Sequence, residues 1–363
     1  MSRSYNGCTL SEQLTQRDAM HALCTDETSA TSDTAVRTGS FTTEDPCVHE
    51  AATVPWDTLV TPLSRGPYKH AITFLTSPGL ILYRERFWCN TRIQGLSPPD
   101  MFAFAVPLQV GRTARWWGAQ LSETGLPAMM PGGIHADLPE GHQHLAALID
   151  LRLLRNSVPA ELMDAIESSS RQHMLPVSSN TLGCLSATLN TLLASMSADP
   201  QALHHPNAIR SMQEDLLAVF CQSLTLPTSS PRRVGRAIRQ GGLKRAVEFL
   251  RSTKSSSITI ADLCAAAQVT QRTLEYAFRE TFGMSPLGYL HLRRYHAARR
   301  DLLAADAKKV TVGEIAQKNG FCQMGRFAVR YKILFNDSPS DTLQRPPEKG
   351  DRHLLPTADF ALL

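Results

Sequence analysis

Two short segments of the chain carry polar side chains suited to contact nucleic acid. Arginine, glutamine and glutamate can hydrogen-bond to base edges in the major groove, and arginine and lysine can also pair with phosphates. We predict DNA contacts from Gln271, Arg272, Glu275, Tyr276 and Arg279 in the first segment, and from Gln323, Met324, Arg326, Val329, Arg330 and Lys332 in the second.

The elements that must position these residues form one pattern that occurs twice. Thr259–Val269 has its counterpart in Thr311–Phe321, and Phe282–Pro286 has its counterpart in Phe335–Pro339. In each copy a threonine can cap the start of one helix and a Ser-Pro pair can start another, while glycine or asparagine can end the helix between them. The repeat predicts two helix-turn-helix units in an all-α domain over residues 242–345.

A long helix joins the two predicted units. It begins at Pro286 and ends near Ala305, a length of roughly 20 residues or about 30 Å. Two units on one face of straight DNA must lie about 34 Å apart to enter successive turns of the major groove. The length of this helix is therefore compatible with two units that contact successive major grooves.

The charge of the chain is distributed unevenly. Residues 231–345 hold 21 Lys and Arg against 9 Asp and Glu, whereas the remainder holds 16 against 24. A basic domain on an otherwise acidic protein favours a polyanion as the partner of that domain. We interpret residues 227–241, which are rich in arginine, as a basic linker that precedes it.

Residues 242–343 resemble the DNA-binding domain of AraC/XylS transcription regulators. The resemblance rests on Thr311-x-x-Glu-Ile-Ala-x-x-x-Gly-Phe321, followed by Phe327, Tyr331-Lys332, Phe335 and Pro339-Ser340. The pattern Gly325-Arg-Phe-Ala-x-x-Tyr331 is similar to the subgroup that includes ethanolamine-utilisation regulators. The resemblance implies a cupin-like sensor and dimerisation domain upstream. It also implies a bacterial activator that binds double-stranded promoter DNA and recruits RNA polymerase.

The second predicted unit departs from the family pattern. Members of the family commonly have polar residues where this chain has Met324 and Gly325, and Ala328 and Val329 add no hydrogen-bonding side chains. We therefore expect the second recognition helix to contribute phosphate and thymine-methyl contacts more than bidentate contacts with bases.

Residues 51–226 predict a β-domain followed by a helical hairpin, which makes the whole chain α+β. From Trp56 to about Leu154, short apolar runs alternate with Pro and Gly turns, as in an antiparallel barrel or sandwich. Over residues 178–226, leucines recur at helical spacing. This leucine stripe either packs under the β-domain or forms the interface of a homodimer, and periodicity alone does not separate the two.

The β-domain has residues that could bind a small organic anion. Aromatic and basic side chains fall close together in the sequence, although packing in a core with arginines at the surface is the alternative. The hypothesis is that an inducer bound here changes the arrangement of the DNA-binding units. The alternative is a ligand-independent regulator that is controlled by its abundance or by a protein partner. The residues are Phe87, Trp88, Trp116 and Trp117, with Arg84, Arg86, Arg112 and Arg115.

We predict no enzymatic activity, no cofactor and no metal site. His135, His142 and His144 are spaced like ligands of a metal cupin, but the residues that follow offer only Asp150 as a carboxylate. A DNA-repair alkyltransferase would need clustered thiols to hold zinc, and Cys8, Cys24 and Cys47 lie far apart.

The two ends of the chain are predicted to be peripheral. Residues 1–50 are rich in Thr, Ser, Asp and Glu, which indicates a disordered arm, and residues 346–363 form a tail. Because the sequence has no apolar run long enough to cross a membrane, we expect a cytoplasmic protein associated with the nucleoid.

Overall fold

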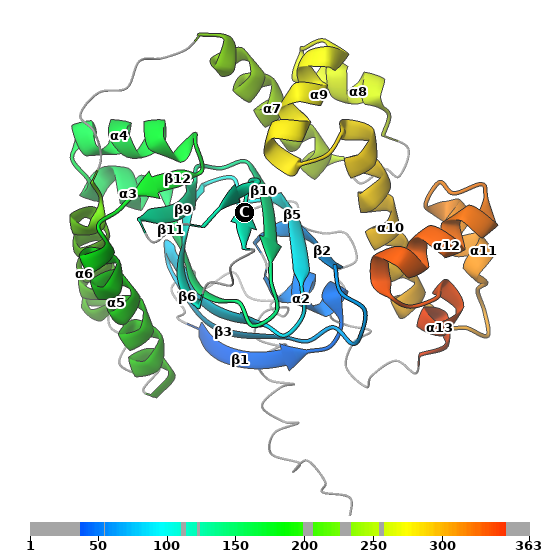
Figure 1. The fold of residues 1–363 in the computed structure, drawn as a ribbon, viewed down its shortest axis with the longest axis horizontal. Coiled ribbons are helices and arrows are strands. Elements are labelled where there is room, and N and C mark those ends of the chain that lie inside the picture. Colours follow the sequence, from blue (N-terminus) through cyan, green and yellow to red (C-terminus); the bar gives the residue numbers. More distant parts are fainter. Residues whose placement is uncertain are drawn as a thin grey trace, which may run out of the picture.

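The chain has a β-sheet domain at its N-terminal side and a helical domain at its C-terminal side (Figure 1). The structure is a computed structural model. It describes residues 37–53, 55–109, 114–121, 124–198, 206–225, 234–253 and 258–345.

Two antiparallel sheets form the N-terminal domain and curve around a shared interior (Figure 1). The larger sheet has seven strands in the order β1 (Arg37–Thr43), β3 (His70–Ser77), β4 (Leu80–Phe87), β11 (Gln143–Asp150), β6 (Met101–Gln109), β9 (Gly125–Met129) and β12 (Met174–Pro176). The smaller sheet has five strands in the order β2 (Asp57–Pro62), β5 (Thr91–Leu96), β10 (Gly133–Leu138), β7 (Arg115–Trp116) and β8 (Ala119–Gln120).

Side chains of β4 alternate between the two faces of the larger sheet. Leu80 and Leu82 belong to the apolar cluster beneath the helices, while Tyr83 and Phe87 belong to the cluster between the sheets. This period of two follows from the pleat of a strand. It places Glu85 on the interior face, because Glu85 is two residues from both Tyr83 and Phe87.

Part of the predicted disordered arm is ordered, so the expected boundary at residue 50 is wrong. Arg37–Thr43 forms the edge strand β1, and Pro46–Ala52 forms helix α2. Asp45 caps α2 by accepting a hydrogen bond from the Cys47 backbone N–H, and Pro46 occupies the first helical turn. The short polar strand and two-turn helix gave no sustained apolar period. Residues 1–36 lie outside the described part of the chain.

In the described part of the chain, four helices accompany the last strands of the larger sheet. Helices α3 (Leu151–Ser157) and α4 (Ala160–Ser170) come between β11 and β12, and helices α5 (Ser179–Ala198) and α6 (Pro206–Ser223) come after β12. Helices α5 and α6 form the predicted hairpin and cover the outer face of the larger sheet (Figure 1).

The leucine stripe of this hairpin packs inside the protomer. Leu185, Leu189 and Leu193 are buried in one cluster with strand residues, and the Phe220 and Phe104 rings stack at 4.7 Å. The interpretation as a packing face is therefore confirmed. The stripe is not free to form a dimer interface, so it lends no support to the predicted homodimer.

The described residues of the C-terminal domain form seven helices: α7 (Val234–Ser252), α8 (Ile260–Ala267), α9 (Gln271–Phe282), α10 (Pro286–Ala304), α11 (Val312–Lys318), α12 (Met324–Phe335) and α13 (Pro339–Gln344). Helix α7 begins at Val234 rather than at Gly242, so the predicted linker over residues 227–241 is partly helical. Residues 226–233 lie outside the described part of the chain.

The boundaries of the doubled pattern are as predicted. Thr259 and Thr311 each begin a helix with a reciprocal capping box, in which the partners are Asp262 and Glu314. Helix α9 ends at Gly283 with φ of 68°, and α12 ends at Asn336 with φ of 56°. Both residues adopt the left-handed conformation that stops a helix.

The long helix α10 has 19 residues, which gives a length of about 28 Å. Within the described part of the chain, no helix combines the length and the hydropathy needed to cross a membrane.

We expect Thr311→Ala to loosen helix α11, because the substitution removes the side-chain oxygen that caps it. Loss of such a cap costs about 1 kcal/mol. Hydrogen exchange should then show protection of the α11 amides reduced about fivefold relative to wild type. Thr311→Ser keeps the hydroxyl and should leave protection nearly unchanged. Equal protection in the two variants would contradict the assigned cap.

Candidate nucleic-acid interface and sensor cavity

Helix α9 presents the first set of predicted DNA-contacting residues on its outer face. Gln271, Arg272, Tyr276 and Arg279 are exposed, and Glu275 is half-buried. The opposite face is buried by Leu274, Ala277, Phe278 and Phe282. One face is therefore used for packing, and the other is left free and polar.

Neighbouring side chains on α9 hold one another in position. Arg272 Nη2 donates to Tyr276 Oη at 3.5 Å, and the guanidinium lies 5.8 Å from the centre of the Tyr276 ring. Gln271 Nε2 donates to Glu275 Oε1 at 3.4 Å. These pairs are one helical turn apart, which is the spacing at which side chains on a helix meet.

Helix α12 presents the second set less completely. Gln323, Arg326, Val329, Arg330 and Lys332 are exposed. Met324 is half-buried and packs against the apolar core of the domain. Only part of Met324 is therefore available for a contact with DNA.

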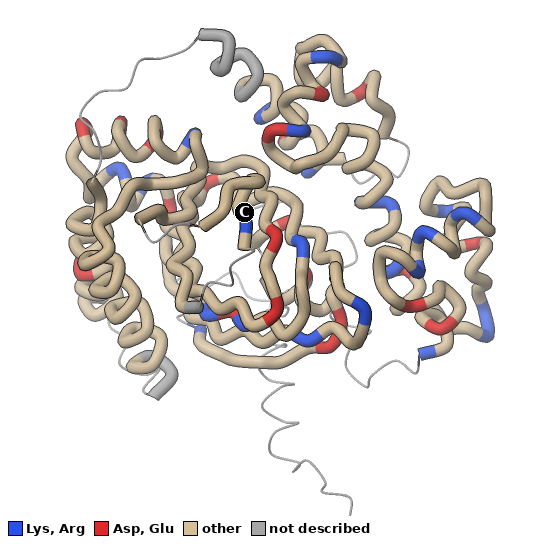
Figure 2. The backbone as a smooth tube through the Cα atoms, viewed as in Figure 1, with Lys and Arg blue, Asp and Glu red and all other residues tan. Residues whose placement is uncertain are grey.

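Ile333 is an exposed residue of α12 that the sequence pattern missed. Its side chain is 60% exposed, and that of Val329, one turn earlier, is 64% exposed. Figure 2 shows Lys and Arg positions along the backbone from α9 to α12. The second set therefore combines basic and apolar side chains, as its sequence predicts.

A buried arginine supports both α10 and α12. Arg299 on α10 is 2% exposed; its Nη1 donates to Tyr331 Oη at 3.3 Å, and its Nη2 donates to Asp45 Oδ2 at 2.7 Å. Tyr331 Oη in turn donates to Thr342 Oγ1 at 3.0 Å. Burial alone would lower the pKa of Arg299, but the Asp45 carboxylate holds that pKa above its ordinary value.

Helix α2 and strand β2 of the β-sheet domain contact helix α10 through ion pairs, which we call the α2–α10 junction. Glu50 accepts from Val60 N at 2.8 Å and pairs with His296 Nδ1 at 2.6 Å. Its second oxygen pairs with Arg300 at 3.3 Å. The other pairs are Asp57 with Arg293 at 2.8 Å, Asp45 with Arg299 at 2.7 Å and Asp45 with Arg345 at 3.2 Å.

The β-sheet domain also contacts the C-terminal ends of α9 and α12. Gln94 Nε2 donates to the carbonyl of Phe282 at the end of α9. Asn336 Nδ2, just after α12, donates to the carbonyl of Ser64 at 2.9 Å. Leu59 and Leu96 of the smaller sheet are buried in the same apolar cluster as Phe282. The β-sheet domain therefore contacts the ends of both α9 and α12.

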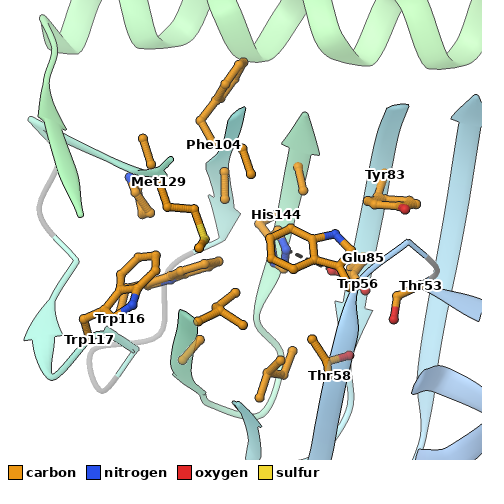
Figure 3. A pocket seen from close by; sticks show the side chains of 18 of the residues that line it. Thr53, Trp56, Thr58, Tyr83, Glu85, Phe104, Trp116, Trp117, Met129 and His144 are labelled. Carbon is orange, nitrogen blue, oxygen red and sulfur yellow. Dashed lines mark ion pairs between the residues drawn. The ribbon is translucent and has the colours of Figure 1, made fainter. Parts of the chain in front are cut away.

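A cavity that is partly open to solvent lies between the two sheets (Figure 3); its empty space, open solvent included, is about 610 Å³. Its walls are mostly apolar, and Trp116 and Trp117 stand on the side opposite Glu85 (Figure 3). The polar lining is confined to a few residues: His49, Thr53, Thr58, Glu85 and His144.

The predicted aromatic and basic pocket is only partly correct. Trp116 and Trp117 line the cavity. Phe87 is buried in the core, and Trp88 stacks under Lys69 and Arg86 instead.

The predicted cationic lining is wrong. Arg84 lies on the face of β4 that meets α5, where it donates to Asn190, and Arg86 and Arg115 are exposed. Strand alternation directs Glu85, rather than its neighbours Arg84 and Arg86, into the cavity. Arg112 lies outside the described residues.

Three imidazoles converge on the Glu85 carboxylate, and we call these four residues the His/Glu cluster. Glu85 Oε1 lies 3.1 Å from His70 Nε2 and 3.4 Å from His49 Nε2, and Oε2 lies 3.0 Å from His144 Nε2. The rings of His49 and His70 stack with centroids 3.6 Å apart. His144 is directly opposite Glu85 in the β4–β11 pair.

Burial and mutual contact shift the pKa values in this cluster. Burial would raise the pKa of Glu85, but hydrogen bonds from His144, His49 and His70 hold it well below its ordinary value. Burial and the nearby His49 lower the pKa of His70 to about 4. At neutral pH the carboxylate is therefore ionised and the His70 ring is neutral.

The sequence predicted no metal site because no suitable carboxylate follows His144, and the fold removes this reason. The expected carboxylate is absent from the residues after His144, but strand pairing supplies Glu85 from β4. His49, His70 and Glu85 offer ligand atoms that all lie within 4.8 Å of one another. Of the three histidines considered from the sequence, only His144 joins the cluster. His135 pairs with Asp137 at 3.7 Å, and His142 is buried beside His144.

Comparison with known proteins identifies relatives of the helical domain. Residues 263–345 match a family described as "Helix-turn-helix domain". A Rhodococcus erythropolis protein named "Probable thc operon regulatory protein" is 37% identical over 107 residues, which cover 30% of this chain and 32% of that protein. The "XylDLEGF operon transcriptional activator 3" of Pseudomonas putida is 31% identical over 144 residues, which cover 39% of this chain and 43% of that protein.

The matched region spans less than half the length of each of these two relatives. Among solved structures, the AraC-like transcriptional activator CuxR aligns over 76% of this chain and 98% of its own, at 15% identity and a TM-score of 0.37. A score this low carries no argument about the arrangement of the two domains.

We expect Glu50→Gln to weaken the α2–α10 junction, because His296 and Arg300 lose their anionic partner. A charged group left without its partner costs about 1–3 kcal/mol. Hydrogen exchange should therefore increase in both α2 and α10. Glu44→Gln, the same change at an exposed position two residues before Pro46, is the control and should leave exchange unchanged. Unaltered exchange in Glu50→Gln would show that the junction does not hold the helices.

Proposed function

From the premise that this chain carries the DNA-binding domain of an AraC/XylS-type transcription regulator, we propose that it binds promoter DNA through two helix-turn-helix units. The units are α8 with α9 and α11 with α12. We further propose that a small molecule in the cavity between the sheets controls this binding, and that the chain acts as an activator, as the names of its relatives suggest.

The observation that carries the proposal is the paired exposure of α9 and α12. Each helix buries one face in a single continuous core and leaves the other face exposed with side chains that can contact DNA. Helix α10 separates the two pairs by about 28 Å of helix, close to the 34 Å repeat of the major groove. Both helices can therefore lie along one face of a DNA duplex.

The two units would contribute differently. Helix α9 carries arginine, glutamine and glutamate side chains that can hydrogen-bond to base edges. Helix α12 has exposed Arg326, Arg330 and Lys332 for phosphates, and Val329 and Ile333 for thymine methyl groups. We propose that α9 determines which sequence is bound and that α12 anchors the protein. RNA polymerase, the partner expected of an activator, would meet this protein on the bound promoter.

The cavity has the lining of a ligand site. Pockets for small molecules are mostly apolar with a few polar groups that orient the ligand, and the lining of this cavity has the same character. Among the described residues that line it there is no arginine or lysine. We therefore propose a largely apolar ligand whose polar group faces Glu85 and His144.

Helix α2 offers a route from the cavity to the DNA-binding domain. His49 lines the cavity, and the next residue, Glu50, pairs with His296 and Arg300 of α10. A ligand that moves α2 would change the ion pairs of Glu50 with α10. Because α10 joins the two helix-turn-helix units, the position of one unit relative to the other would change as well. Such control requires that the ligand bind the two arrangements with unequal affinity.

We expect Arg272→Ala and Lys332→Ala to weaken DNA binding in different ways. Loss of Arg272 should cost about 1–3 kcal/mol on a selected operator and much less on random DNA. Loss of Lys332 should weaken both DNAs alike and reduce the salt slope by about 1. Fluorescence anisotropy over a range of salt concentrations, with an operator selected from a random library, measures both effects. Equal losses on operator and random DNA for Arg272→Ala would refute its proposed role.

We expect Ala136→Leu to abolish the ligand response without abolishing DNA binding, because the added carbons fill space inside the cavity. The wild-type chain is first screened against small metabolites by thermal shift, and hits are tested for an effect on DNA affinity. The variant should lose both effects, while Ala119→Leu, at an exposed position, should keep them. If no metabolite altered the wild type, a ligand-independent regulator controlled by abundance or by a protein partner would replace the proposal.

A further inference from the structure

We propose that His49, His70 and Glu85 bind one divalent transition-metal ion in the wall of the cavity, while His144 holds the other oxygen of the Glu85 carboxylate. The four side chains come from α2, β3, β4 and β11, and all are buried. Elements far apart in the sequence thus bring two imidazole nitrogens and a carboxylate oxygen close to one another.

The spacing of the donor atoms fits a shared ion. The Nε2 atoms of His70 and His49 lie 3.1 and 3.4 Å from Glu85 Oε1, and the donor atoms of these three residues all lie within 4.8 Å of one another. Donors bonded to one zinc ion at 2.0–2.1 Å in a tetrahedral arrangement are about 3.3–3.4 Å apart. Small movements of the side chains would therefore be enough to bond these three residues to one ion.

The charge of the cluster also favours a cation. Glu85 is 6% exposed, and among the residues that the structure describes its ion pairs are with histidines. A buried carboxylate is costly unless a positive charge compensates it. A divalent ion would supply this charge, and imidazole with carboxylate is a ligand set that suits zinc, iron and nickel.

In each histidine ring of the cluster, Nε2 rather than Nδ1 is the nitrogen that faces Glu85. The other ring nitrogen of His49 bonds to the Tyr68 hydroxyl, which directs Nε2 toward Glu85. In the described protein, the Nδ1 atoms of His70 and His144 are buried without a hydrogen-bond partner. The polar contacts of these two rings are therefore concentrated at the Nε2 atoms that face Glu85.

The ion would face the cavity. His49, Glu85 and His144 line the cavity, whereas the rest of its wall is mostly apolar. A coordination position on that side would accept an oxygen or nitrogen of the small molecule. This last step rests on the proposed ligand control, but binding of the ion does not depend on it.

The test measures metal binding by the full-length chain after removal of bound ions with EDTA. Titration with Zn²⁺ should give one tightly bound ion per chain and a rise in Tm of about 5 °C or more. Glu85→Gln and His70→Asn should weaken binding at least about 100-fold. Glu140→Gln and His135→Asn make the same changes outside the cluster and should bind as the wild type does.

Spectroscopy of the wild-type chain keeps the test decisive if a variant fails to fold. Loading with Co²⁺ should give the visible absorption of a site with nitrogen and oxygen ligands. A thiolate charge-transfer band would place the ion at a cysteine, such as the buried Cys47 on α2, and would overturn the proposal. Zinc binding that is absent in the wild type, or unchanged in Glu85→Gln, would show a purely hydrogen-bonded cluster. Neither result would bear on DNA binding, which is measured separately.

Discussion

The pairing of α2 carboxylates with cations on α10 is the interaction on which the arrangement of this protein depends. Arg299 is a fully charged group in a site with almost no exposure, and Asp45 lies 2.7 Å from it. Removing one partner of a buried pair costs about 3–5 kcal/mol, because the other charge stays buried without compensation. The pair therefore strongly disfavours separation of α2 from α10. Since Arg299 also contacts Tyr331, the same cation positions α12.

The position of α2 gives it two roles. His49 lines the cavity, and the next residue, Glu50, pairs with His296 and Arg300 of α10 in the helical domain. A helix of only seven residues has little internal stability, so its position is set by what it touches on each side. Under the proposed ligand control, a change of contact in the cavity would be transmitted through α2 to α10, which lies between α9 and α11 in the chain.

Many features of the C-terminal domain could be predicted from the sequence because they are local. Thr259, Gly283, Ser285 and Asn336 act on the backbone within a few residues, so their capping and stopping roles follow from the sequence alone. The inward and outward faces of α9 follow from a period of 3.6 residues in the same way. The strands and the helical hairpin of the N-terminal domain were also predicted, because alternation and leucine spacing are local patterns.

The His/Glu cluster and the α2–α10 junction could not be predicted, because they depend on partners distant in the sequence. Glu85 and His144 are 59 positions apart and meet only because β4 pairs with β11 in one register; a shift of one residue would turn Glu85 to the other face. The burial of Arg299 depends on Asp45, which is 254 positions away in the sequence. The sequence by itself determined the boundaries of the helices from α8 to α13, their exposed faces and the basic charge, since these depend on neighbours along the chain. The tertiary structure alone decided which carboxylates face the cavity and the junction, since strand register and domain docking select partners in space.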